Sequence, residues 1–112
     1  MSDSTKYNWV KDTVVVSGDI TDAFAEVVDL GLDYMFRHLM IYTTLDEPIV
    51  LRFFNPISES WNELKIPAKP SDAPGFSLVL DQFLHNGSLQ LKHESGAAPT
   101  AGEIKLVTWR GE

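Results

Sequence analysis

The sequence predicts an all-β fold, a two-sheet antiparallel β-sandwich of about eight short strands, of which the jelly roll is one form. Three observations predict it. Short apolar or alternating segments recur along the 112 residues, breaks rich in Pro, Gly and Asn separate them, and no βαβ alternation occurs. Length and composition, with 44% hydrophobic and 22% charged residues, are those of one globular domain.

The polar residues 1–6 are expected to form a flexible N-terminal arm, and residues 7–112 a single domain. Its strands are expected at 9–16, 20–32, 34–44, 49–54, 61–66, 76–84, 88–94 and 103–109. The segment 20–32 is ambiguous, because Ile20, Phe24 and Val27 fall on one helical face with Thr21 as a possible cap. The strand, ending at Leu30 and Gly31, is favoured over the helix because its neighbours are β.

Two hairpins and one crossing are expected from the breaks between strands. Asn55 and Pro56 separate the strands 49–54 and 61–66 of the first hairpin. Asn86 and Gly87 suit a type I′ turn, which predicts a second hairpin between 76–84 and 88–94. Residues 67–75 contain three prolines and are expected to be a long surface connection between the two sheets.

The charge balance excludes some partners. Nine basic residues stand against 16 acidic residues, a net charge of −7, which argues against nucleic acid and anionic membranes. Six acids and no base lie from Asp12 to Asp33. They predict a solvated face, with a docking surface for a basic partner or a cation site built on Asp19, Asp22 or Asp29 as alternatives.

Cysteine content, the first ten residues and the longest apolar run bear on the compartment in which the protein is found. The chain has no cysteine, so disulfides, thiolate zinc sites and a thiol nucleophile are excluded, and a reducing cytosol is expected. Residues 1–10 lack the pattern of a signal peptide, and the longest apolar run, 39–42, is too short to span a membrane.

No residue pattern predicts catalysis, a cofactor or a metal. The histidines His38, His85 and His93 lie apart, and none has a partner at metal-ligand spacing. Nucleophile-elbow and phosphate-loop motifs are absent from the sequence. Among carboxylate pairs, Asp81 with Glu94 depends on the fold, and the small domain leaves little room for a cleft.

Aromatic side chains are the candidate binding residues. Trp9, Tyr42, Trp61 and Trp109 are candidate interface or ligand aromatics. Trp61 is expected to pack into the core or an interface, because it opens the strand that contains Leu64 and Ile66. An exposed Trp61 is the feature that an alternative function, a carbohydrate-binding β-sandwich module, requires.

Strands at 49–54, 76–84 and 104–109 carry apolar residues on both faces. A two-sheet sandwich needs only one apolar face per strand, so the surplus predicts self-association or another protein partner. A structural or assembly role is therefore favoured over catalysis.

The run 81–109, with its turn His85-Asn86-Gly87 and the small-residue loop 95–102 before a final strand, resembles small β-rich virion proteins of tailed bacteriophages. The pieces 29–31 and 61–67 are similar to them in character. The resemblance covers the C-terminal third best and has no signature motif. It implies a non-enzymatic decoration, fibre-base or head-and-tail connecting protein. Such a protein is made in the bacterial cytoplasm and resides in the virion, with further copies of itself and other virion proteins as partners.

Overall fold

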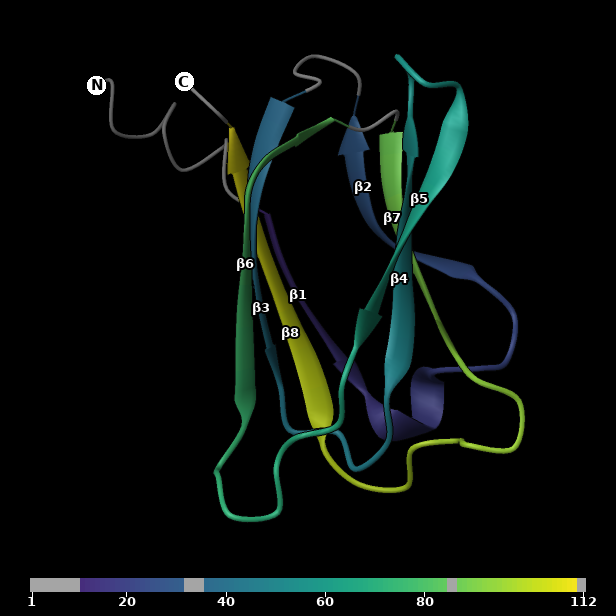
Figure 1. Ribbon diagram of the computed structural model, residues 1–112, viewed down its shortest axis with the longest axis vertical. Coiled ribbons are helices and arrows are strands. Elements are labelled where there is room, and N and C mark those ends of the chain that lie inside the picture. Colours follow the sequence, from purple (N-terminus) through teal and green to yellow (C-terminus); the bar gives the residue numbers. More distant parts are fainter. Residues whose placement is uncertain (1–10, 32–35, 85–86, 111–112) are drawn as a thin grey trace.

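The computed structural model describes residues 11–31, 36–84 and 87–110, which form eight strands (Figure 1). The strands are β1 (Lys11–Val16), β2 (Ala25–Gly31), β3 (Phe36–Thr43), β4 (Ile49–Asn55), β5 (Ser60–Ile66), β6 (Phe76–Leu84), β7 (Gly87–His93) and β8 (Glu103–Arg110). One turn of 3₁₀ helix, Ser17–Asp19, follows β1. The proposed arm at 1–6 and the start of the first expected strand lie outside the described residues.

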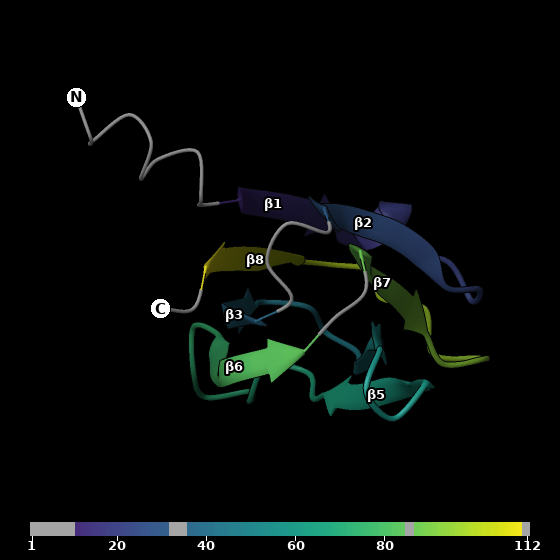
Figure 2. The same ribbon diagram turned by 90° about the horizontal axis from the view of Figure 1, so that it is seen from above.

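The strands form two layers, as Figure 2 shows from above. One four-stranded sheet, called sheet A, has the order β1-β8-β3-β6, and the other, sheet B, has the order β2-β7-β4-β5. All described pairings are antiparallel. Consecutive strands lie in different sheets except for β4 and β5. The predicted antiparallel β-sandwich is confirmed.

The core lies between the sheets because inward side chains alternate with outward ones along each strand. In β3, Leu39, Ile41 and Thr43 are fully buried, whereas Met40 between them is 45% exposed. The same alternation places the following residues in the core: Ile104 and Leu106 of β8, Leu89 and Leu91 of β7, and Ile49, Leu51 and Phe53 of β4.

The ambiguous segment 20–32 is a strand in its second half, so the helical alternative is wrong. Ala25–Gly31 pairs with β7, and Val28 and Leu30 are buried. Backbone pairing with β7 outweighs the helical spacing of the apolar residues, because both buried side chains already face the core in the extended form.

The first expected hairpin is confirmed by the antiparallel pairing of β4 with β5. Asn55 stabilises its turn, because its side-chain oxygen accepts hydrogen bonds from the amides of Ile57 at 2.8 Å and Ser58 at 3.2 Å. The connection 67–75 leads from sheet B to sheet A, as expected. It is held to the turn after β3 by the Lys69 amide, which donates to the Leu45 carbonyl at 3.0 Å.

The second expected hairpin is wrong, because β6 lies in sheet A beside β3 while β7 lies in sheet B between β2 and β4. Gly87 does have the positive φ of 105° for which glycine is suited. Asn86 lies outside the described residues. A glycine turn is compatible with a hairpin or a crossing, and the apolar face of each strand is buried in either case, so the local pattern could not separate them.

The loop 95–102 is fastened to the turn after β3 at one end of the sandwich. The Asp46 carboxylate accepts hydrogen bonds from the Thr100 hydroxyl at 2.6 Å, the Thr100 amide at 2.9 Å and the Ala101 amide at 3.2 Å. These bonds, that of the Thr100 hydroxyl first, lower the pKa of Asp46 below its ordinary value.

Candidate functional site

The outer face of sheet A carries an apolar patch, defined here as Val14, Met40, Val79 and Val107. The β3 residue Met40 stands opposite Val107 of β8 and Val79 of β6 in the sheet register. Val14, Met40 and Val79 are 54%, 45% and 52% exposed, and Val107 is half-buried. Met40, Val79 and Val107 therefore form an apolar row across β6, β3 and β8. On β1 the row is continued by Asp12, and Val14 stands opposite Lys105.

Two predicted aromatics flank this patch. Tyr42 lies two residues after Met40 on the same strand face, and its ring packs so closely on Gly75 that a side chain there would collide with it. Trp109 lies two residues after Val107 and stacks on His38, with ring centroids 5.4 Å apart and planes 21° apart. The structure thus brings two of the four candidate aromatics to one face. Trp9 lies outside the described residues.

His38 also contacts a carboxylate, which the sequence did not indicate. Its Nδ1 lies 2.7 Å from Oδ1 of Asp81. The contact depends on a register shift between β3 and β6 at this point, where one additional residue of β6 is accommodated. The pairing of Asp81 with Glu94 does not form, because Glu94 follows β7 of the other sheet and its carboxylate lies 3.2 Å from Nζ of Lys65.

Trp61 lies on the outer face of sheet B and not in the core, and the other part of the expectation, that it packs at an interface, stays a prediction. It is 41% exposed, while Ile66 on the same strand is fully buried. The reason is strand parity: residues 62, 64 and 66 share one face of β5, and residue 61 belongs to the other. Its ring meets Phe54 edge to face, with centroids 5.4 Å apart.

On this outer face, Arg52 of β4 contacts side chains of the neighbouring strands β5 and β7. Its guanidinium carbon lies 3.9 Å from the Trp61 ring centroid and 4.0 Å from that of Phe24. Its Nε donates a hydrogen bond of 2.8 Å to Oε1 of Gln90 on β7. Sequence reasoning missed this cluster, because Phe24, Arg52 and Trp61 become neighbours only through sheet pairing.

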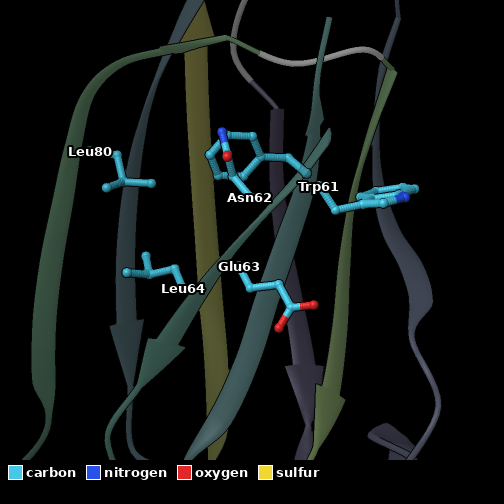
Figure 3. Close-up of a pocket in the computed structure, with 6 residues that line it drawn as sticks. Trp61, Asn62, Glu63, Leu64 and Leu80 are labelled. Atoms are coloured by element: carbon cyan, nitrogen blue, oxygen red, sulfur yellow. The ribbon is translucent and has the colours of Figure 1, made fainter. Parts of the chain in front are cut away.

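A pocket of about 380 Å³ lies between the sheets where the edge strands β5 and β6 face each other. Figure 3 shows Asn62 and Leu64 pointing from β5 toward Leu80 of β6, whereas Trp61 and Glu63 point to the opposite side of β5. The pocket is mainly apolar and holds no pair of catalytic groups in its described lining.

Within the described residues, no group of three or more histidine and carboxylate side chains is gathered as a metal site would require. No helix in that part of the chain has the length and hydrophobicity to cross a membrane.

Comparison with known proteins gives similarity of fold alone. No known protein family and no curated protein matches the sequence. A solved structure of the Bacillus endospore appendages, described as disulfide-linked pili, matches with a TM-score of 0.53 and 9% identity over 92% of this chain and 86% of that one. The vertex protein P5 of PRD1 matches with a TM-score of 0.56 and 11% identity over 92% of this chain and 73% of that one. The fold of this chain is therefore one that also occurs in a pilus and in a virion vertex protein.

Proposed function

We propose that this protein is a non-enzymatic structural protein that assembles as repeated copies, and that it packs through the apolar patch on sheet A. The observation that carries the proposal is the exposure of Val14, Met40 and Val79 together on one sheet face. Single exposed apolar residues are ordinary on a protein surface, but apolar residues that adjoin across three neighbouring strands mark an interaction site.

The tryptophan and tyrosine beside the patch support an interface. Tyr42 and Trp109 are half-buried and offer large rigid surfaces, and aromatic residues are enriched at protein interfaces. The centre of the patch lacks charge, since Met40 stands between two valines in the register. Burial of this centre against a partner releases water from apolar surface without leaving a buried charge unpaired.

We further propose that the protein is part of a virion. The resemblance to small phage virion proteins supports it, and so does the similarity of fold to the vertex protein P5. The strand orders β1-β8-β3-β6 and β2-β7-β4-β5 support the inference that the sandwich is a jelly roll, an arrangement used in viral capsids. The partners are then other copies and other virion proteins, after synthesis in the bacterial cytoplasm.

Light scattering behind a sizing column tests the assembly. We expect the parent protein to form an oligomer at micromolar concentration and Met40→Lys to shift it toward the 12.5 kDa monomer. Ile57→Lys is the matched control, because Ile57 is 73% exposed but lies in the turn between β4 and β5. A monomeric parent, or equal loss of assembly in both variants, would contradict the proposed interface.

A second candidate function, carbohydrate binding, is favoured by one specific observation. Trp61 is 41% exposed, and sugar-binding proteins stack sugar rings on accessible aromatic faces. A glycan-array screen of the parent protein beside Trp61→Ala tests it. The expected result is a saccharide signal that the variant loses, and a parent without any signal would remove this candidate.

A further inference from the structure

The outer face of sheet B holds a fixed guanidinium group. We call Arg52, Phe24, Trp61 and Gln90 the Arg52 clamp. Two aromatic rings lie about equally close to the Arg52 guanidinium carbon, at 3.9 and 4.0 Å, and the Gln90 side chain accepts from Nε at 2.8 Å. Contacts from three directions restrict the orientation of the guanidinium plane, so little side-chain entropy remains to be lost when a ligand binds.

Arg52 is half-buried, and its hydrogen bond to Gln90 uses only Nε of the guanidinium group. The terminal nitrogens of Arg52 make no hydrogen bond to a described residue, and although Glu63 stands directly opposite Arg52 in the register, the two form no ion pair among the described contacts. A guanidinium group with its terminal N–H donors free matches a carboxylate with two parallel hydrogen bonds.

A second cation lies beside the clamp. The Lys92 ammonium is 5.0 Å from the Phe24 ring centroid, and no described carboxylate pairs with it. By contrast, Nζ of Lys65 lies 3.2 Å from Oε2 of Glu94, and Nζ of Lys105 lies 3.9 Å from Oε2 of Glu103. Arg52 and Lys92 thus contact aromatic rings instead of pairing with a described carboxylate, and an anion bound between them gains two cationic partners beside the acids Glu26 and Glu63, which stand opposite Gln90 and Arg52 in the register.

The position of the clamp favours a saccharide over a peptide as the source of the carboxylate. Arg52 lies on β4 and Gln90 on β7, and both strands are internal in sheet B, so their backbone groups are already paired. A peptide could add to the sheet as an extra strand only at its edge strands, β2 and β5, and not at Arg52 or Gln90. Trp61 is 41% exposed, and because Arg52 covers one face of its ring, a sugar ring would stack on the other face.

We propose that the outer face of sheet B binds an acidic saccharide. The Arg52 fork receives a sugar carboxylate, Lys92 adds a second positive charge, and Trp61 contacts the sugar ring. This inference rests on the second candidate function, carbohydrate binding, and is independent of assembly through sheet A, which lies on the opposite side of the sandwich.

Titration calorimetry with an oligogalacturonate, and with the same oligomer as its methyl ester, tests the proposal on the full chain. The two probes share their sugar rings and differ in the carboxylate charge. We expect the acid to bind and the ester to bind at least roughly tenfold more weakly, since charge-assisted hydrogen bonds are lost. Arg52→Gln should weaken binding of the acid by a similar factor, and Arg52→Lys, which keeps the charge but loses the fork, by less.

Lys105→Gln is the matched control, because it removes one positive charge from the outer face of sheet A and should leave the affinity unchanged. Circular dichroism of each variant verifies that the sandwich is folded. Equal binding of acid and ester would overturn the acidic specificity while carbohydrate binding stands, whereas no binding of either probe together with a blank glycan array would remove both. Equally tight, Arg52-dependent binding of polyglutamate would overturn the saccharide in favour of an acidic peptide.

Discussion

Three glycines outside the strands offer a graded test of how closely the ends of β3 and β8 approach each other in sheet A. Gly102 has φ +93°, and a side-chain carbon placed there would overlap the backbone of Thr44, including its carbonyl oxygen. Gly96 has φ +80° but nothing within 4 Å of such a carbon. Gly18 also has open space, and no positive φ. Alanine therefore adds both backbone strain and a collision at position 102, backbone strain alone at position 96, and neither at position 18.

The expected costs follow from these two terms. Gly96→Ala should lower the free energy of unfolding by about 1–2 kcal/mol, the cost of a left-handed backbone for an L-residue. Gly102→Ala should lower it by that amount plus about 1–3 kcal/mol for a collision that only a backbone shift relieves. Gly18→Ala should be neutral or raise it by up to about 1 kcal/mol, because the unfolded chain loses freedom.

Urea unfolding followed by tryptophan fluorescence measures all three variants against the parent protein. The Gly102 substitution should lower stability most because this residue also links the ends of β1, β8 and β3 in sheet A: its carbonyl accepts from the Ser17 amide at 3.0 Å, and the next residue, Glu103, accepts from the Thr44 amide at 2.9 Å. If Gly102→Ala costs no more than Gly96→Ala, the close approach of Thr44 to this loop is refuted.

Three further predictions concern single side chains. Asp46→Asn should lower the melting temperature at neutral pH. Because the pKa of Asp46 in the folded protein lies below its ordinary value, the difference in melting temperature from the parent should shrink as the pH falls through about 4 and below. A difference that does not depend on pH would contradict the hydrogen bonds from Thr100 and Ala101. Trp61→Ala should lower the free energy of unfolding in urea by about 1–2 kcal/mol, because the contacts with Arg52 and Phe54 are lost. A core tryptophan would cost roughly 3–5 kcal/mol, and a loss in that range would refute the outward position of Trp61. Gly87→Val should cost at least about 1 kcal/mol, since Gly87 has φ +105°, and an unchanged unfolding midpoint would contradict that backbone conformation.

The alternation of apolar and polar residues was sufficient to predict the buried faces of β7 and β8. Leu89 and Leu91 on one face of β7, and Ile104 and Leu106 on one face of β8, follow directly from the period of two. The turn at Asn55 was equally predictable, because its signal is local to the chain.

The choice of partner strand could not be predicted from the same pattern. β6 and β7 each have an apolar face that either sheet could bury, and the glycine turn between them does not decide whether they pair or separate. The outward position of Trp61 could have been predicted, because residues 61 and 66 lie on opposite faces of an extended strand and Ile66 is buried. The large aromatic side chain of Trp61 nevertheless favoured a place in the core.

The surface sites depend on pairing across several strands, so their locations could not be predicted from the sequence. The apolar patch needs Met40 beside both Val79 and Val107, and the Arg52 clamp needs residues from separate segments. Apolar residues on both faces of β4, β6 and β8 did indicate that some outward surface would be apolar, although not that sheet A would carry it.

Because the chain contains no cysteine, a single introduced thiol tests the assembly face directly. Met40→Cys places a thiol at the centre of the apolar patch, and Ile57→Cys places one in the exposed turn after β4. The measurement is the rate of thiol labelling as the protein concentration is raised. If copies pack through sheet A, labelling at position 40 slows as the oligomer forms while labelling at position 57 stays constant. Equal and concentration-independent labelling at both positions would contradict assembly through this face.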